Sequence, residues 1–416
     1  MSNSVSNRLT EVIREGIQEE SHVSSRHPHW SRLSEVGTEL WLDTGDMEVA
    51  GRLWSSEFTA LTTNNTLLNK EIQKGIYDRW IPEVAEAIRQ DQPEIDQHNL
   101  ILEVAFALNA RHALRLVERF GADVSVELHT DLAHDVERSI SYGQRYHALS
   151  PENFIVKVPL TAEGLVAARH LVEEGIRVNF TLGFSARQNV LIACVAQPHY
   201  CNVFMGRLNA YSSDEELGDG RWVGEKASLA SQNAIARLRS EFGSRTRQIG
   251  ASMRTGEQVA TLAGSDIYTM PPGVVENFLD DLPALETIAN RVAEVYEPTW
   301  NADVNPAREG LDTLWDVPAD FEATCREIGS WPVAQLTPAA ILEALSAAGH
   351  GSVLPKLDPS RIQMIVEAGK MPKRSQWVDA LASGEVGLDA LFTLAGLHSF
   401  AADQAALDER ILKQLG

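Results

Sequence analysis

The sequence of 416 residues has little cysteine, few positive charges and no long apolar run. Its three cysteines, Cys194, Cys201 and Cys325, are odd in number and show no CxxC spacing, so neither a disulfide framework nor a zinc site is predicted. No run of about 18 apolar residues suggests a transmembrane helix, and the N-terminus has no apolar core of the kind that a signal peptide needs. We therefore expect a soluble, cytoplasmic protein.

Positive charge is scarce throughout the chain. Lys and Arg number 36 against 58 Asp and Glu, a formal net charge of −22, which argues against nucleic acid or an anionic membrane as a partner. Any anionic ligand must then be bound by a few placed cations. Neither GxGxxG nor GxxxxGK[ST] occurs, so a nucleotide cofactor has no support. The twelve histidines, including His129 and His134 in "HTDLAH", show no metal-ligand spacing, and no metal site is predicted.

The fold class follows from a repeated alternation of strand-like and helix-like segments. Eight short runs typical of strands follow one another: "ELWLDTG", "TALTTNN", "ADVSVEL", "FIVKVPL", "IRVNFTL", "YCNVFMG", "RQIGASM" and "SDIYTMP". Helix-like stretches such as "AEGLVAARHLVEEG" separate most of them. Eight such units predict an α/β protein with a (β/α)8 barrel rather than a doubly wound open sheet.

The segments before and after the eight strand-like runs have a different sequence pattern. We expect residues 1–35 to form a polar, partly helical segment, residues 36–295 the catalytic barrel, and residues 296–416 an all-helical C-terminal region. Within that region, Thr337 with Pro338 and Asp358 with Pro359 are typical helix starts. The region carries no chemical motif, and we interpret it as a separate lobe or a lid over the barrel.

Polar residues recur at matching positions of the predicted strands. Residues at i and i+2 of a strand share a face, and chemistry in such barrels gathers near the C-terminal strand ends. Seven of the eight runs offer polar residues with this phase. In strand order, the candidates are Asp43; Thr62 and Asn64; Glu127; Lys157; Asn179 and Thr181; Asn202 and Phe204, with Arg207 just beyond; and Ser252 with Arg254.

Each candidate also has a plain structural interpretation. Lys157 alone would be an edge-strand or snorkelling lysine, Asp43 the N-cap of the next helix, and Glu127 the partner of a basic neighbour. The asparagines could satisfy loop backbone, and Arg207 and Arg254 could sit in surface ion pairs. These separate explanations would leave it to coincidence that the polar residues occupy matching positions in seven predicted strands. The matching positions therefore favour a functional site.

The candidates together suit Schiff-base chemistry. Lys157 stands among apolar residues with no obvious acidic partner, and burial lowers a lysine pKa, which would make it a nucleophile toward a ketone or aldehyde. Asp43 could take the proton from the hydroxyl of the carbon that is cleaved off, and Glu127 with Thr181 could hold a water molecule. Amides suit sugar hydroxyls, and Arg207, Arg254 and Ser252 together suit a phosphate group.

Six motifs make the chain resemble the transaldolase family. They are "DTGD" (43–46), "TTN" (62–64), "IVKVPLTAEG" around Lys157, "EEGIRVNFTLGFS" (173–185), "FMGR" (204–207) and "GASMR" (250–254), and they span about residues 40–285. The resemblance implies a barrel enzyme of carbohydrate metabolism, in the pentose phosphate pathway, that moves dihydroxyacetone between sugar phosphates without a metal or organic cofactor.

The resemblance also implies a role for each candidate. Lys157 would form the Schiff base, Asp43 would be the general acid and base, and Glu127 with Thr181 would hold the water. Binding of the substrate would fall to the remaining candidates: Thr62, Asn64, Asn179, Asn202, Phe204, Arg207, Ser252 and Arg254.

Two sites depart from the family pattern. Asn65 replaces the usual proline, which is expected to loosen the turn that aims Asn64. Before "FMGR", Asn202 and Val203 replace the usual serine and proline, so that one hydroxyl contact to the donor sugar becomes an amide contact. Substrate choice is therefore less defined than reaction type. Two other functions stay open, a Schiff-base aldolase that releases dihydroxyacetone and a non-catalytic sugar-phosphate-binding protein, and the chain could be a monomer or a homodimer.

Overall fold

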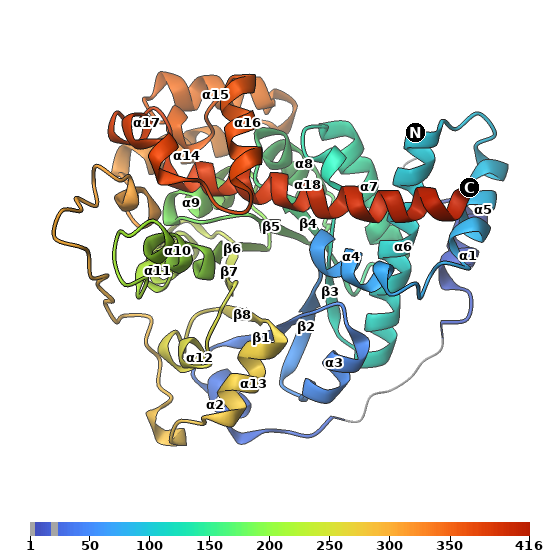
Figure 1. Cartoon of the computed structure of the whole chain (residues 1–416), viewed down its shortest axis with the longest axis horizontal. Helices are drawn as coiled ribbons and strands as arrows, with labels where there is room; N and C mark the ends of the chain where they lie inside the picture. Colours follow the sequence, from blue (N-terminus) through green and yellow to red (C-terminus); the bar gives the residue numbers. More distant parts are fainter. Residues whose placement is uncertain (1–4, 18–23) are drawn as a thin grey trace.

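The computed structural model describes residues 5–17 and 24–416. Its centre is a closed barrel of parallel strands in chain order, which confirms the predicted fold (Figure 1). The strands are β1 (Glu39–Asp43), β2 (Phe58–Thr62), β3 (Asp123–Glu127), β4 (Phe154–Pro159), β5 (Val178–Thr181), β6 (Tyr200–Phe204), β7 (Arg247–Ala251) and β8 (Ile267–Met270). Seven of the eight runs proposed from the sequence contain a whole strand, and the eighth, "TALTTNN", contains all of β2 except Phe58.

Helices connect the strands and cover the outside of the barrel. Between β1 and β8 lie α3 (Met47–Leu53), α4 (Asn65–Gln73), α5 (Ile81–Asp91), α6 (Gln97–Phe120), α7 (Val136–Leu149), α8 (Ala162–Glu173), α9 (Ala186–Val195), α10 (Met205–Asp214), α11 (Val223–Phe242) and α12 (Glu257–Thr261). Before β1 lie α1 (Asn7–Arg14) and α2 (Pro28–Glu35), and after β8 lies α13 (Pro272–Asp280). Residues 18–20, the end of the first helical stretch suggested by the sequence, lie outside the described residues.

Alternation along the strands places an apolar layer beneath the site. One cluster of buried side chains consists of Trp41, Ala60, Ile155, Ile249, Ala251 and Ile267. In β1, β2 and β4 these residues lie two positions before Asp43, Thr62 and Lys157. Since residues two apart share a face, the polar side chains form the next layer toward the C-terminal strand ends. The intervening apolar residues, such as Leu42 and Val156, belong to the larger core shared with the helices.

The strand register brings particular residues side by side. Lys157 is paired with Glu127 of β3 on one side and with Asn179 of β5 on the other. Asp43 is likewise paired with Thr62 of β2. Residues that are far apart in the sequence therefore meet at one end of the barrel.

The C-terminal region consists of helices, as the sequence predicts. They are α14 (Ala319–Gly329), α15 (Pro338–Ala347), α16 (Pro359–Ala368), α17 (Val378–Ala382) and α18 (Leu388–Leu415). The predicted N-caps of α15 and α16, Thr337 and Asp358, both accept hydrogen bonds from the first turn of their helix. In Figure 1, α18 runs across the molecule from the α16 and α17 end to α5.

These C-terminal helices share the apolar core of the barrel. Phe321 of α14 and Ile341 of α15 belong to the cluster that surrounds the strands. Phe392 of α18 belongs to a second cluster together with Leu182 and Phe184, which follow β5. The helices are thus packed onto the barrel, and the proposed division at residues 35 and 295 stays a prediction.

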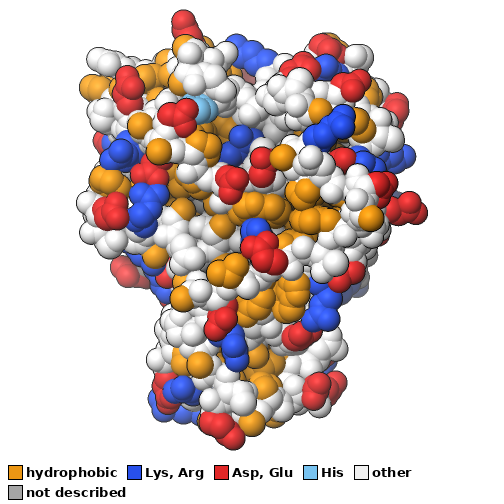
Figure 2. Space-filling model, turned by 90° about the vertical axis from the view of Figure 1, so that its left-hand side faces the viewer, with side chains coloured by type: hydrophobic (Ala, Val, Ile, Leu, Met, Phe, Trp, Pro, Cys, Tyr) orange, Lys and Arg blue, Asp and Glu red, His pale blue; other side chains and the backbone are white. Residues whose placement is uncertain are grey.

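The charges of the surface are mixed. On the face shown in Figure 2, acidic and basic side chains are interspersed, and the basic ones form no continuous patch there. Within residues 5–17 and 24–416, no helix combines the length and the apolar character that crossing a lipid bilayer requires.

Candidate active site

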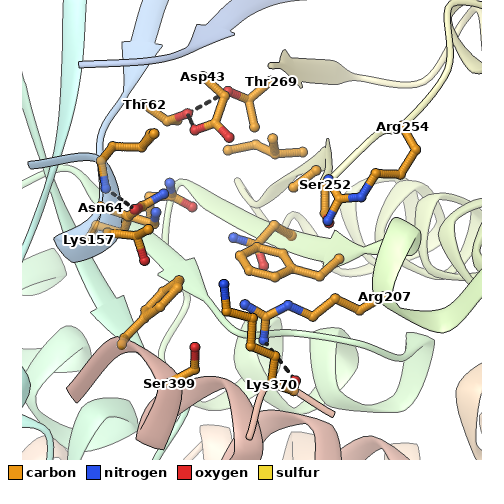
Figure 3. Close-up of a pocket in the computed structure, with 18 of the residues that line it drawn as sticks. Asp43, Thr62, Asn64, Lys157, Arg207, Ser252, Arg254, Thr269, Lys370 and Ser399 are labelled. Atoms are coloured by element: carbon orange, nitrogen blue, oxygen red, sulfur yellow. Dashed lines mark hydrogen bonds between the residues drawn. The ribbon is translucent and has the colours of Figure 1, made fainter. Parts of the chain in front are cut away.

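A pocket of about 240 Å³ opens at the C-terminal ends of the strands (Figure 3). This end of the barrel is where such folds place their chemistry. Ten of the residues proposed from the sequence line it: Asp43, Thr62, Asn64, Lys157, Asn179, Asn202, Phe204, Arg207, Ser252 and Arg254. The other two, Glu127 and Thr181, are buried beside it and are absent from its lining.

Lys157 is paired with an acid, contrary to our expectation of an isolated lysine. Its side chain is only 5% exposed, and Nζ lies 3.3 Å from Oε2 of Glu127. Nζ also donates a hydrogen bond of 3.1 Å to the carbonyl oxygen of Thr63. Glu127 lies 30 residues earlier in the chain, and only the parallel register of β3 and β4 brings it to Lys157. A closed barrel has no edge strand, so the edge-residue interpretation of Lys157 is wrong.

The carboxyl group of Glu127 is strongly influenced by its surroundings. Burial raises its pKa, while the neighbouring Lys157 opposes that rise, as does the backbone N–H of Asn65, which faces the carboxylate. A buried carboxyl with a raised pKa readily accepts a proton from a nearby group. Glu127 is therefore suited to exchange a proton with Lys157 or with a water molecule beside it.

Asp43 lies at the end of β1 in a network of hydroxyl groups. Thr62 Oγ1 donates a hydrogen bond of 2.6 Å to Asp43 Oδ1 and lies 2.6 Å from Thr269 Oγ1. Burial raises the pKa of Asp43, whereas the positive charge of Lys157 lowers it. The N-cap interpretation of Asp43 is wrong, because Asp46 caps α3. Asp43 is thus available for proton transfer in the pocket.

Asn64 is held in place by the helix that it starts. As the N-cap of α4, its Oδ1 accepts a 2.8 Å hydrogen bond from the backbone N–H of Leu67. This bond fixes the turn that the missing proline at position 65 was expected to loosen. The side-chain oxygen is occupied, so the amide nitrogen is the group that Asn64 can offer to a ligand.

Two buried oxygen atoms of β5 lack hydrogen-bond partners among the described residues. They are Thr181 Oγ1 and Asn179 Oδ1, although the amide nitrogen of Asn179 donates a 3.0 Å hydrogen bond to Ser125 Oγ. On the other side of β4, Glu127 Oε2 has Lys157 Nζ as its ion-pair partner. Buried polar atoms nearly always form hydrogen bonds. The unpaired atoms at the floor of the pocket are therefore available to bind water or a ligand.

Asn202 and Phe204 form the β6 side of the pocket. Asn202 Oδ1 accepts a 3.3 Å hydrogen bond from the backbone N–H of Gly183. A Cβ atom at Gly183 would lie 2.3 Å from the carbonyl oxygen of Asn202, so only glycine fits between these two strand ends. Phe204 packs against Phe184 with ring centroids 5.6 Å apart.

Arg207 and Arg254 lie together at one side of the pocket (Figure 3). Burial and the charge of Arg254 lower the pKa of Arg207 to about 10, and burial also lowers the pKa of Arg254. Their side chains donate to backbone carbonyls, Arg207 to Lys370 at 3.4 Å and Arg254 to Met253 at 3.2 Å. No ion pair with a carboxylate is found for either within the described chain, so the expected alternative of surface ion pairs is not what the structure has.

The phase that we proposed for β7 is wrong. The strand ends at Ala251, and its pocket-facing residues are Ile249 and Ala251 rather than the alternate set containing Ser252. Ser252 reaches the pocket because its φ of 61° turns the chain beyond the strand. A left-handed conformation at a non-glycine residue costs energy and often marks a functional site.

Sequence reasoning missed several residues of the pocket. Thr269 follows the same alternation as the others, since it lies two residues after Ile267 on β8, and that pattern could have found it. The others carry no such signal: Thr66 and Lys70 of α4, Lys370 after α16, and Ser399 and Phe400 of α18. The last three belong to the C-terminal region, from which we expected no chemical motif.

No group of three or more His, Cys, Asp or Glu side chains suited to a metal ion occurs in the described parts of the chain. The cysteines are free thiols: Cys201 and Cys325 are buried and Cys194 is half-buried. Burial raises the pKa of the Cys194 thiol to about 12, so it is not poised as a nucleophile. Lys157 is the candidate nucleophile of the pocket.

The chain matches the model of the family described as Transaldolase/Fructose-6-phosphate aldolase over residues 40–325. It belongs to this family. The transaldolase of Xanthomonas euvesicatoria is 30% identical over 246 residues, which are 56% of this chain and 73% of the relative. That of Protochlamydia amoebophila is 30% identical over 249 residues, 58% and 75% of the two chains. One from Nostoc is 28% identical over 246 residues, 57% and 73% of the two.

Membership of the transaldolase/aldolase family makes the chain an enzyme of that family. The match contains all twelve residues proposed from the sequence, because they lie between positions 43 and 254. It ends at residue 325, before Lys370, Ser399 and Phe400. The part of the pocket wall that these three residues form therefore lies outside the matched region.

Proposed function

We propose that the protein is a transaldolase that transfers a dihydroxyacetone unit from a ketose phosphate to an aldose phosphate through a Schiff base on Lys157. The observation that carries this proposal is the buried Lys157, 3.3 Å from Glu127, at the floor of a pocket that also contains Asp43 and two arginines. The donor is fructose 6-phosphate or sedoheptulose 7-phosphate. The reaction belongs to the pentose phosphate pathway and takes place in the cytoplasm.

The first step is attack of Lys157 Nζ on the C2 carbonyl of the ketose. A protonated amine must first lose a proton, and Glu127 is placed to accept it. The carbinolamine then loses water, which requires a proton donor at its hydroxyl group. Glu127 with Thr181 supports this exchange: Glu127 gives back the proton that it took from Lys157, and the buried Thr181 Oγ1, which has no hydrogen-bond partner in the described chain, can hold the water molecule.

The second step breaks the bond between C3 and C4. Asp43 takes the proton of the C4 hydroxyl, the C4–O bond becomes a carbonyl, and the electrons of the C3–C4 bond pass into the iminium ion to form an enamine. The aldose phosphate leaves. In the reverse sense, the enamine attacks the acceptor aldehyde while Asp43 returns the proton. Thr62 supports Asp43 in both directions by its hydrogen bond.

The remaining proposed residues bind the sugar and its phosphate. Asn64 offers an amide nitrogen, and Asn179 offers Oδ1, which lacks a partner in the described chain. Asn202 and Phe204 shape the wall, while Arg207, Ser252 and Arg254 receive the phosphate. Guanidinium groups suit phosphate because they donate two parallel hydrogen bonds.

Borohydride trapping tests the Schiff base. Incubation with fructose 6-phosphate and reduction should leave a mass adduct on the peptide that contains Lys157, because the iminium ion becomes a stable secondary amine. A Lys157→Met variant provides the control. Binding of the sugar without any adduct would contradict the proposal and favour a non-catalytic sugar-phosphate-binding protein.

Product analysis separates transfer from simple cleavage. The family description also names fructose-6-phosphate aldolase. In simple cleavage, the enamine takes up a proton at carbon instead of attacking an aldose, and water then hydrolyses the iminium ion to release dihydroxyacetone and free Lys157. With erythrose 4-phosphate present, a transaldolase should form sedoheptulose 7-phosphate and little free dihydroxyacetone. Equal release of dihydroxyacetone with and without the acceptor would identify an aldolase instead.

A further inference from the structure

The outer wall of the pocket is built by residues that the family match does not reach. Lys370, Ser399 and Phe400 line the pocket opposite the strand ends, and Figure 3 places Lys370 next to Arg207, with Ser399 nearby. Lys370 comes directly after Gly369, whose φ of 81° ends α16 and turns the chain toward the pocket. The backbone carbonyl of Lys370 accepts the hydrogen bond from Arg207 Nη1.

The wall is attached to the barrel by buried polar contacts at one end of α18. Asp389 is fully buried and accepts hydrogen bonds from Arg187 Nη2 at 2.7 Å and from Ser185 Oγ at 2.6 Å. Thr393 Oγ1 donates a 2.8 Å hydrogen bond to the carbonyl oxygen of Leu182, a residue with a φ of 65° directly after β5. These contacts fix the start of α18 against the mouth of the barrel.

The other end of α18 is attached to the opposite side of the mouth. Arg410 forms an ion pair with Asp78, which precedes α5. Thr66 Oγ1, in the first turn of α4, donates a hydrogen bond to Asp403. Both ends of α18 are thus attached to the barrel, the helix runs across the molecule in Figure 1, and its residues Ser399 and Phe400 line the pocket.

The middle of α18 is shaped around Arg207. A Cβ atom at Gly396 would lie 2.7 Å from Leu182 Cδ2 and 3.1 Å from Arg207 Nη1. Glycine within a helix is unfavourable by about 1 kcal/mol relative to alanine, and here the missing side chain leaves space next to the ends of the Leu182 and Arg207 side chains. The ring of Phe400 lies 5.8 Å from the Arg207 guanidinium carbon, within cation–π distance.

The charges at this wall lack neutralising partners. Within the described chain, no ion pair links Arg207, Arg254 or Lys370 to a carboxylate, although the protein carries a net charge of −22. Asp403, the acid whose charge acts on Arg207, is hydrogen-bonded to Thr66. Asp43, the acid that lines the same pocket, acts on Arg254 through its charge but forms no ion pair with it in the described chain, so the three cations remain available to a doubly charged anion.

We propose that Lys370 is a third cation of the phosphate subsite, and that the C-terminal region thereby contributes directly to recognition of the phosphorylated sugar. The ligand class is a phosphate monoester, whose three oxygen atoms can receive Arg207, Arg254 and Lys370 together. Ser399 supplies a hydroxyl group beside them. The inference rests on the proposed function for the identity of the sugar, whereas the phosphate site itself stands on the arrangement of the cations.

The test compares four forms of the full-length protein: wild type, Lys370→Ala, Lys370→Arg and Lys373→Ala. Lys373 is the matched control, because it is an exposed lysine three residues further on and does not line the pocket. Inorganic phosphate binding is measured by calorimetry, and KM and kcat are measured with fructose 6-phosphate and with unphosphorylated fructose. Thermal unfolding checks that the variants are folded.

Lys370→Ala should weaken phosphate binding and raise KM for fructose 6-phosphate about tenfold, the effect of losing one charge-assisted hydrogen bond. kcat and the kinetics with unphosphorylated fructose should stay unchanged. Lys370→Arg should restore most of the affinity, and Lys373→Ala should match the wild type.

Equal phosphate affinity of Lys370→Ala and Lys373→Ala, both folded, would overturn the inference even if the wild type transfers dihydroxyacetone. Conversely, a wild type without transfer activity whose phosphate binding depends on Lys370 would contradict the proposed function and leave the phosphate subsite standing. The two failures are therefore distinguishable.

Discussion

The pocket has two halves of different origin, a floor made by the strand ends and a wall made by the C-terminal region. The floor contains Lys157, Glu127 and Asp43, all within hydrogen-bonded or ion-paired networks among parallel strands. The wall contains Lys370 and Phe400, which come from a turn and a long helix. Regular strand register positions the first half, whereas irregular packing positions the second.

This difference suggests a division of labour. Under the proposed function, the floor holds the groups that form and break bonds, which must be placed within fractions of an ångström and must be desolvated. The proposed role of the wall is to contact the non-reacting end of the substrate, where the binding requirement is charge and shape. Changes in the floor should therefore reduce kcat, and changes in the wall should act on substrate affinity or on stability.

Replacement of Lys157 should have the largest effect. Lys157→Met keeps the length of the side chain but removes the nucleophile, so we expect transfer activity to fall by about 10⁴-fold or more. Steady-state kinetics with fructose 6-phosphate and erythrose 4-phosphate measure this loss. Retention of activity above one-hundredth of the wild type would exclude Lys157 as the Schiff-base residue.

Asp43→Asn should separate Schiff-base formation on Lys157 from cleavage of the bond between C3 and C4. The amide can still accept the hydrogen bond from Thr62 but cannot take a proton, so kcat should fall by about 10²–10⁴-fold. The borohydride adduct on Lys157 should still form. Asp46→Asn is the matched control in the same loop, because asparagine caps a helix as well as aspartate does. A normal kcat in Asp43→Asn would remove it from the mechanism.

Much of the floor could be predicted from the sequence because its residues follow strand periodicity. The alternation that buries Ile155 also places Lys157, two residues later, in the layer above it. Periodicity gives no strand neighbours, so a basic partner was suggested for Glu127 but Lys157 was not identified as that partner. It also fails where a strand ends, as at Ser252, whose positive φ reverses the expected phase.

The wall could not be predicted because no local pattern encodes it. Lys370 in "EAGKMPKR" resembles any exposed lysine after a helix, and its place beside Arg207 depends on how α16 and α18 pack on the barrel. Gly396 carried a weak signal, since a glycine inside a long helix requires an explanation. The sequence predicted the helical character of the region and the N-caps of α15 and α16 correctly, but not the surface that these helices cover.

Breaking the attachment of the wall should mainly reduce stability. Asp389→Ala leaves Arg187 buried without its partner, which should cost about 3–5 kcal/mol of the free energy of unfolding. Arg361→Ala, which breaks an exposed ion pair with Glu385 in the same region, is the control and should leave the unfolding midpoint unchanged. Equal midpoints for the two variants would contradict the view that Asp389 fixes α18.

Asn65→Pro should have the smallest effect. It tests a position next to the floor of the pocket at which the sequence departs from the family pattern. Asn65 is the first residue of α4, where proline is favoured, and Asn64 before it is extended, so the backbone accepts the change. Proline removes the backbone N–H of residue 65. That N–H faces Glu127 and opposes the rise in the Glu127 pKa that burial causes. The pKa of Glu127 should therefore rise further. Because the proposed role of Glu127 requires its ionised form, the acid limb of the kcat/KM profile should move to higher pH. Asn65→Ala keeps the N–H and should show the wild-type limb, whereas coinciding profiles of the two variants would show that this N–H has no influence on Glu127.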